Sequence, residues 1–154
     1  MLRNLLRTPD DKAIAFLRVI LAIVIFPHGA QKMLGWFGGF GPSGTMGFLT
    51  RQMHIPAAVA MLVFVGEFFA PIALFFGFLG RLSALAIAID FTVVALKVHI
   101  HNGFFMNWGG QQKGEGVEFF MLAVAIAIAI VIRGSGAFSI DRMLARDTPP
   151  ARTA

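Results

Sequence analysis

The chain has 154 residues, of which 57% are hydrophobic and only 14% are charged, and its mean hydropathy is +0.77. Soluble domains average about 45–50% apolar and about 25% charged residues, so this composition indicates a membrane protein, and the length suits one domain. The lack of cysteine excludes disulfides, thiolate metal sites and dithiol redox chemistry by this chain. The net charge of +5 does not indicate a nucleic-acid partner, because the basic residues lie at span ends and in the tails.

Four apolar segments predict four transmembrane helices, at about 13–32, 56–80, 82–99 and 117–132. Basic residues before the first segment resemble the start of a signal peptide, but no small-residue cleavage site follows, so we expect an uncleaved span. Only Gly80 and Arg81 separate the second and third segments, which predicts a tight antiparallel hairpin. The last segment contains AVAIAIAIVI, in which alternating Ala and Ile could suggest a β-strand. We predict a helix instead, because an isolated strand cannot cross lipid. The predicted fold is therefore an all-α membrane protein, a four-transmembrane-helix antiparallel bundle that forms one domain over residues 1–154.

The distribution of lysine and arginine predicts that both termini are cytoplasmic. The larger set lies in the N-terminal segment, at the hairpin turn and in the tail 133–154, and consists of Arg3, Arg7, Lys12, Arg81, Arg133, Arg142, Arg146 and Arg152. The smaller set consists of Lys32, Arg51, Lys97 and Lys113. Arg18 is expected to snorkel to the nearer surface. Loops 33–55 and 100–116 then lie outside, where their tryptophans and phenylalanines suit an aromatic belt and 45–54 suits a short interfacial helix.

Ionisable residues inside the predicted spans are expected to face the interior of the bundle. At about 1.5 Å of rise per residue, Glu67 on the second span and Asp90 on the third meet near the midplane. His28 and Lys32 lie one turn apart on the same face of the first span, further toward the outer surface. Asp90 has a simpler interpretation, in which it bonds a nearby hydroxyl such as that of Thr92.

The third and fourth spans also bring charge to the outer half of the predicted bundle. Lys97 and His99 end the third span, and Glu118 begins the fourth, with Glu115 one turn before it. Lys97 and His99 lie about 200° apart on a regular helix. Either the helix loosens near Gly103 or one of the two faces the lipid headgroups. The predicted polar pocket therefore consists of six residues: His28, Lys32, Glu67, Lys97, His99 and Glu118.

Each member of this set also has a structural interpretation. His28 and Lys32 suit interface anchors at a span end. An ionised Glu67 inside a membrane requires a cation. A purely structural salt bridge to Lys32 or Lys97, which holds the helices together, therefore explains Glu67 as well as a functional pocket does. The glycines of GWFGGFG are more typical of turns and close packing than of a phosphate-binding loop, because no strand precedes them.

Five stretches together resemble the DoxX family of small four-helix membrane proteins. They are PHGAQKMLGWFGG, VGEFFAPIALFFGFLGR, VHIHNGFF, NWGGQQKGEGVEF and GSGAFSIDRML, and the resemblance covers roughly residues 12–144. It implies a four-helix bundle in a bacterial inner (plasma) membrane and a loose association with redox processes. Relatives in the wider family are linked to thiosulfate–quinone oxidoreduction and to a membrane complex with oxidative-stress enzymes. The family pattern, carried over to the matching positions of this sequence, implies a set of site residues: His28, Lys32, Glu67, His99 and Glu118.

Three functional hypotheses follow from the predicted pocket. In the first, the protein is an accessory or quinone/lipid-binding component of a redox-related membrane complex: His28 or His99 donates to a quinone carbonyl, and Glu67 and Glu118 pass protons. In the second, it is a non-enzymatic scaffold or subunit with a structural polar cluster and a membrane or redox protein partner. In the third, His28, His99 and Glu118 bind zinc or iron, although the histidines lack close ligand spacing. No catalytic residue and no metal are assigned; quinone is the candidate cofactor, and a homo-oligomer is left open.

Overall fold

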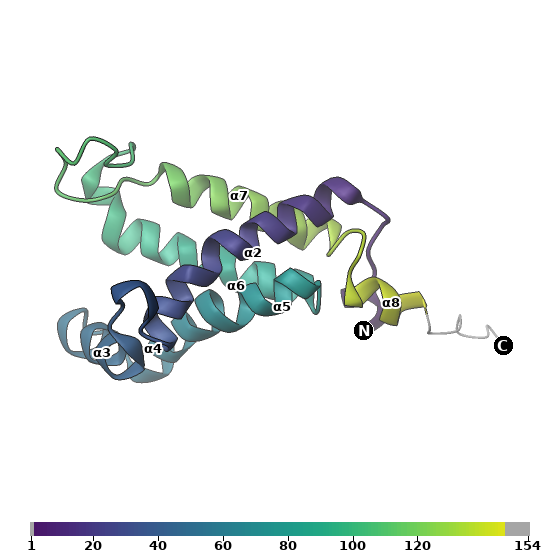
Figure 1. Ribbon diagram of the computed structural model, residues 1–154, viewed down its shortest axis with the longest axis horizontal. Coiled ribbons are helices and arrows are strands. Elements are labelled where there is room, and N and C mark those ends of the chain that lie inside the picture. Colours follow the sequence, from purple (N-terminus) through teal and green to yellow (C-terminus); the bar gives the residue numbers. More distant parts are fainter. Residues whose placement is uncertain (1, 147–154) are drawn as a thin grey trace.

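The computed structural model describes residues 2–146, and within this range every regular element is a helix, as the sequence predicted. The predicted tail beyond residue 146, Arg152 included, lies outside the described residues. The long segments are α2 (Lys12–Met33), the run of α4 (Ala57–Phe64), η3 (Val65–Phe69) and α5 (Ala70–Phe76), the run of α6 (Gly80–Val94), η4 (Ala95–His99) and η5 (Ile100–Asn102), and α7 (Glu118–Arg133). The short ones are α1 (Leu2–Leu6), η1 (Trp36–Gly38), α3 (Gly41–Gly47), η2 (Phe48–Gln52) and α8 (Ile140–Arg146). Figure 1 shows α1 and α8 at one end of the molecule and α3 toward the other.

Within residues 2–146, three continuous helices are long and apolar enough to cross a membrane: Lys12–Met33, Ala57–Phe76 and Gly80–Asn102. They match the first three predicted segments closely. The fourth predicted segment is helix α7, which has 16 residues and is shorter than these three. Many large apolar side chains on these helices are exposed, for example Phe16, Leu62, Leu96 and Leu122, as expected for surfaces that contact lipid rather than water.

The core lies where α2, α5, α6 and α7 meet. Ile25, Leu74, Ile87 and Ile130 are fully buried there, one from each of these helices. Alanines at intervening positions on α6 and α7 let these two helices pack closely along their length. The helices are apolar on every side, so burial is decided by which small and branched residues interlock rather than by a polar face.

The turn between α5 and α6 lies earlier than predicted. Helix α5 ends at Phe76, and Gly77 and Leu79 adopt left-handed backbone conformations with φ of 67° and 49°. Helix α6 therefore already begins at Gly80, not after Arg81. The side chain of Asp141 holds this turn: its two oxygens accept hydrogen bonds from the backbone N–H of Leu79 (2.7 Å) and of Gly80 (2.8 Å).

The expectation that Arg18 snorkels to the surface is wrong. Its side chain is 2% exposed, and its guanidinium donates to the carbonyls of Leu74 (3.2 Å), Phe75 (3.2 Å) and Phe138 (3.1 Å). The last carbonyls of a helix have no partner within the helix, so Arg18 satisfies those at the end of α5 and ties them to the segment that follows α7.

Asp11 begins α2 at the same end of the molecule. Its carboxylate accepts hydrogen bonds from the backbone N–H of Ala13 (3.0 Å) and of Ile14 (3.1 Å), and Arg133 pairs with it at 3.2 Å. The bond from Ile14 is the largest cause that lowers the pKa of Asp11, and Arg133 lowers it further. A charged N-cap of this kind stabilises the start of the helix.

Two of the long helices contain a π-helical turn within the predicted spans. In η3, Pro71 has no backbone N–H to donate to the carbonyl of Glu67 four residues earlier, which disturbs the α-helical pattern at this point. In η4, the turn includes Lys97 and His99. The sequence left two alternatives open, a loosening of the helix near Gly103 or one of Lys97 and His99 facing the lipid headgroups. The structure has a π turn at Ala95–His99. A π turn adds a residue to the helical turn and so rotates the side chains that follow.

Candidate functional site

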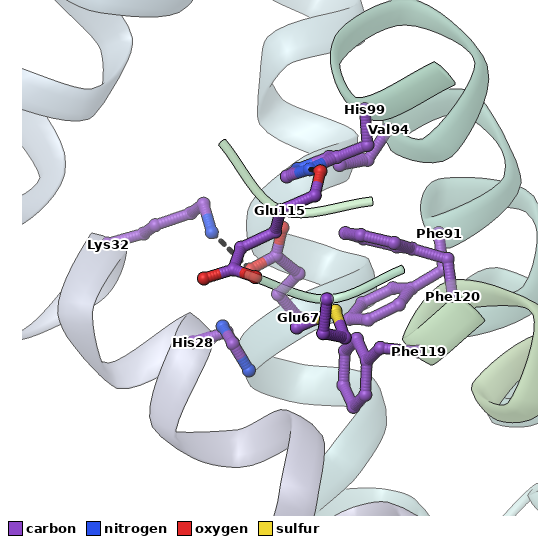
Figure 2. A pocket seen from close by; sticks show the side chains of 10 residues that line it. His28, Lys32, Glu67, Phe91, Val94, His99, Glu115, Phe119 and Phe120 are labelled. Atoms are coloured by element: carbon purple, nitrogen blue, oxygen red, sulfur yellow. Dashed lines mark hydrogen bonds and ion pairs between the residues drawn. The ribbon is translucent and has the colours of Figure 1, made fainter. Parts of the chain in front are cut away.

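A pocket of about 320 Å³ lies among the helices, toward the end of the molecule away from α1 and α8. Its polar lining comes from four separate parts of the chain, α2, η3, η4 and the loop before α7, and its apolar lining comes largely from α6 and the start of α7. Figure 2 shows the lining side chains, which are His28, Lys32, Glu67, Phe91, Val94, His99, Met106, Glu115, Phe119 and Phe120.

An ion pair between Lys32 of α2 and Glu67 of η3 borders the pocket (Figure 2). The side chain of Glu67 is only 4% exposed, and that of Lys32 is 29% exposed. A carboxylate buried this deeply in an apolar surrounding requires a cation or a proton, and Lys32 supplies the cation. The structure therefore selects Lys32 rather than Lys97 as the partner that the sequence left open.

Gly29 makes this pairing possible. A Cβ atom at this position would lie 2.0 Å from the carbonyl oxygen of Glu67 and 2.6 Å from the backbone nitrogen of Phe68. Only glycine therefore lets α2 approach η3 so closely. The close approach places Lys32, three residues further along α2, beside Glu67.

Aromatic rings form one wall of the pocket. Phe119 and Phe120 at the start of α7 lie 6.1 Å and 5.6 Å, between ring centroids, from Phe91 of α6. The imidazole of His28 lies 6.1 Å from Phe119, and that of His99 lies 4.4 Å from Phe120. Both histidines thus lie beside an apolar, aromatic surface, which is a common composition for sites that bind small planar molecules.

The loop before α7 covers part of the pocket and is fixed by Glu115. The backbone carbonyl of Glu115 lies 2.8 Å from Nδ1 of His99 and accepts a hydrogen bond from Asn102 (3.0 Å). Its carboxylate accepts a hydrogen bond from the backbone N–H of Asn107 (2.6 Å). Because Nδ1 of His99 faces this carbonyl, Nδ1 carries the hydrogen. In the neutral ring, Nε2 is then a hydrogen-bond acceptor, and in the protonated ring both nitrogens are donors.

The structure brings four of the six predicted residues together: His28, Lys32, Glu67 and His99 line the pocket, and Lys97 and Glu118 do not. Lys97 is exposed, so of the pair Lys97 and His99 it is the histidine that faces inward. The carboxylate of Glu118 accepts a hydrogen bond from the backbone N–H of Met106 (2.8 Å), and so it holds the loop that covers the pocket.

Sequence reasoning missed the aromatic wall and Met106, and it named Glu115 but left it out of the six-residue pocket. Glu115 lies three residues before Glu118 at the start of α7, and this spacing was the available signal. The aromatic residues gave no signal, because phenylalanine is frequent throughout the chain. The loop between α2 and α4 does not line the pocket. Its Trp36, Phe37 and Phe40 are exposed, as are Phe104, Phe105 and Trp108 of the loop before α7, which suits contact with the membrane interface.

Asp90 lies close behind the ion pair. Its Cβ lies 3.0 Å from where a Cβ of Gly66 would be, so Gly66 allows α6 to approach η3. One carboxylate oxygen of Asp90, Oδ2, is buried and has no hydrogen-bond partner among the described residues. The expected bond to Thr92 is not formed, because the hydroxyl of Thr92 donates to the carbonyl of Ala88 (2.7 Å).

The geometry gives no support to the metal hypothesis. Within residues 2–146, no three side chains of His, Cys, Asp or Glu lie close enough together to hold a metal ion. Of the triad His28, His99 and Glu118, the glutamate lies outside the pocket that the two histidines share.

Comparison with known proteins identifies the family. The model of the DoxX family matches residues 13–101, which is more than half of the chain. The chain belongs to the DoxX family. The matched part contains every predicted site residue except Glu118, and so the DoxX resemblance seen in the sequence is confirmed.

Two curated proteins are similar to this DoxX protein over most of their length. The inner membrane protein YqjF of Escherichia coli (strain K12) is 29% identical over 140 residues, which cover 88% of this chain and 94% of YqjF. An uncharacterized protein of Haemophilus influenzae (strain ATCC 51907 / DSM 11121 / KW20 / Rd) is 26% identical over 140 residues, which cover 89% of this chain and 86% of that protein. No solved structure matches the chain. The apolar helices and the similarity to YqjF together indicate an inner-membrane protein.

Proposed function

We propose that this DoxX protein is an accessory component of a redox-related complex in the inner membrane, and that its pocket binds the headgroup of a quinone or of a similar lipid-borne molecule. The observation that carries this proposal is the position of His28. It lines the pocket, it is exposed, and it lies on the candidate span α2, five residues before the end of that helix. An exposed pocket residue on a candidate span gives a ligand dissolved in the bilayer a lateral entrance to the pocket.

The chemistry of the lining suits a planar ring with carbonyl oxygens. His28 and Lys32 are hydrogen-bond donors for such oxygens, and His99 is one when its ring is protonated. Phe91 and Phe119 supply flat apolar surface. A volume of about 320 Å³ lies at the lower end of the range of about 300–1,000 Å³ for small-molecule sites. It accommodates a headgroup, and the isoprenoid tail of a quinone would stay in the bilayer.

The proposal includes a membrane arrangement. Helix α7 is a fourth crossing that completes an antiparallel four-helix bundle; at about 1.5 Å per residue it is about 24 Å long, so the bilayer is locally thin or its ends extend into the interface. Both termini then lie on one side. The excess of Lys and Arg near them supports a cytoplasmic location, with the pocket in the outer half of the membrane.

Titration of purified protein in detergent micelles with a short-tailed ubiquinone and with menadione tests the proposal. We expect either quinone to raise the apparent Tm in a saturable way. His28→Ala should weaken binding about three- to tenfold, since a hydrogen bond to a ligand contributes about 0.5–1.5 kcal/mol. Lys97→Gln is the matched control, because Lys97 is a nearby basic residue that does not line the pocket. An unchanged Tm at saturating quinone, or equal effects of the two variants, contradicts the proposal.

One observation favours a second function, that of a non-enzymatic scaffold for a membrane or redox protein partner. The Lys32–Glu67 pair and the contact at Gly29 both join α2 to η3, and a structural role explains them without any ligand. Purification of the protein from its native membrane, with Glu67→Gln alongside, separates the two. The scaffold is supported if a stoichiometric partner co-purifies with the wild-type protein without added quinone, and if Glu67→Gln loses both this partner and thermal stability.

A further inference from the structure

A second pocket, of about 610 Å³, lies at the opposite end of the molecule, beside the segment between α1 and α2. It is lined by Asn4, Arg7, Thr8, Pro9 and Arg81. Four of these five residues come from the N-terminal segment, and Arg81 comes from the first turn of α6. We propose that this pocket binds the phosphate group of an anionic phospholipid at the membrane interface. The inference does not depend on the quinone site.

Arg81 is held in place by uncharged groups. Its guanidinium donates to the carbonyl oxygens of Val131, Ile132 (2.7 Å) and Arg7 (3.3 Å), so it joins α6 to the end of α7 and to the end of α1. Its Nε–H has no hydrogen-bond acceptor among the described residues. Binding to the last carbonyls of α7 explains the position of Arg81, but these partial charges do not neutralise a full positive charge.

Arg7 adds a second positive charge to the same pocket. Its side chain is exposed and makes no hydrogen bond or ion pair with any described residue. The acidic residues at this end are engaged elsewhere: Asp10 pairs with Arg142, Asp11 pairs with Arg133, and Asp141 is 1% exposed and bonded to the α5–α6 turn. Within residues 2–146, neither arginine of the pocket therefore has a carboxylate partner, so the site carries about two positive charges.

The polar side chains of the pocket suit a phosphate. Oγ1 of Thr8 accepts a hydrogen bond from the backbone N–H of Gly136 (2.6 Å), which fixes the side chain and leaves the hydroxyl hydrogen to donate. Asn4 adds amide donors. Phosphate oxygens are strong acceptors, and arginine binds them with two parallel N–H groups.

The surroundings favour a phospholipid over a free phosphate. The turn after Arg81 exposes Leu82 and Leu85, and the neighbouring end of α7 exposes Ile128 and Ile132. Leu82 and Leu85 lie on the candidate span Gly80–Asn102, and Ile128 and Ile132 lie on the apolar helix α7 beside it. Exposed apolar side chains next to a basic pocket are the arrangement expected for a bound lipid with its phosphate at the arginines and its acyl chains along the helices. A free phosphate would gain nothing from them.

The test uses the full-length protein in dodecyl maltoside micelles with one additive at a time: dioleoylphosphatidylglycerol, dioleoylphosphatidylcholine at the same mole fraction, or inorganic phosphate. We expect phosphatidylglycerol to raise the apparent Tm and to remain bound in native mass spectrometry, whereas phosphatidylcholine and inorganic phosphate do so weakly. Arg7→Gln should raise the half-saturating mole fraction of phosphatidylglycerol about five- to tenfold, and Arg7→Lys should restore most of the affinity.

Arg51→Gln is the matched control, since Arg51 is an exposed arginine near the opposite end of the molecule and lies outside this pocket. Three results each overturn the proposal: equal stabilisation by phosphatidylcholine, equal stabilisation by inorganic phosphate, or the same loss of affinity in Arg7→Gln and Arg51→Gln. Because the side chain of Arg7 has no partner in the part of the chain that the structure describes, Arg7→Gln is expected to fold normally, so a loss of lipid binding reports on the pocket.

Discussion

Gly29→Ala is the sharpest test of how the first pocket is built. A Cβ at this position would lie 2.0 Å from the carbonyl oxygen of Glu67, whereas ordinary van der Waals contacts of a Cβ begin at about 3.4 Å. Helix α2 and η3 must therefore move apart by about 1.4 Å. The obstructing atoms belong to the backbone, so no side-chain rotation relieves the clash.

Two opposing effects determine how much Gly29→Ala changes the free energy of unfolding. Alanine is favoured over glycine inside a helix by about 1 kcal/mol. Overpacking costs about 1–3 kcal/mol, and more where the obstructing atoms are rigid. A clash with backbone belongs at or above the upper end, so we expect a net loss of about 2 kcal/mol, which corresponds to an apparent Tm lower by about 4–8 °C.

The assay is thermal unfolding of the purified protein in one detergent, with Gly109→Ala as the control. Gly109 lies in the loop before α7, and a Cβ there would contact nothing within 4 Å, so its substitution should leave the Tm unchanged. The separation in Gly29→Ala should also weaken quinone binding, because it moves Lys32 away from Glu67. A Gly29→Ala protein as stable as the wild type or more stable would show that helix propensity decides, and that α2 and η3 are not in close contact.

Three further outcomes follow from the polar contacts. Lys32→Met should lower stability by about 2–3 kcal/mol in thermal unfolding, less than the roughly 3–5 kcal/mol of a fully buried pair because Lys32 is partly exposed, and Lys97→Met should have almost no effect; equal losses would refute the ion pair. Asp141→Asn removes the charge that accepts two backbone hydrogen bonds and should cost about 2–3 kcal/mol, whereas the exposed Asp10→Asn should cost less than about 1 kcal/mol. The pKa of Asp11 is lowered in the folded protein, so its stabilising effect is present above the ordinary value of 3.8 and is lost as the pH falls through the lower folded-state pKa. The difference in Tm between wild type and Asp11→Asn should therefore close at low pH, and a difference that persists there would contradict this cause.

Much of the polar lining of the candidate site could be predicted, because the position of a residue within an apolar helical segment determines its height along the predicted bundle. Counting residues along the apolar segments placed Glu67 near the midplane of the predicted bundle and His28, Lys32 and His99 above it in the same half, and all four line the pocket. The same count could not separate Lys97 from His99. The direction of each side chain depends on the π turn at Ala95–His99, which a regular helical period does not describe.

The loop contribution was also outside the reach of the sequence pattern. Glu115 and Met106 reach the pocket because the loop folds back through hydrogen bonds such as Met106 N–H to Glu118 and Asn107 N–H to Glu115. Such contacts join residues by geometry rather than by periodicity. The spacing of Glu115 from Glu118 indicated charge near the pocket, but it did not predict how the loop folds back, and Met106 gave no signal.

The sequence by itself determined that this is an all-helical membrane protein and where its apolar segments begin and end to within a few residues. It also indicated which polar residues lie in the same half of the predicted bundle. The physical reason is that the thickness of the hydrocarbon layer sets the length of each segment. The tertiary structure decided which side each helix turns inward. Helices that are apolar on every side have no polar face that fixes their rotation about the helix axis. The rotation is fixed instead by close contacts at Gly29 and Gly66 and by the interruption of the helix at Pro71. At the other end of the molecule it is fixed by the hydrogen bonds of Arg18 and Asp141.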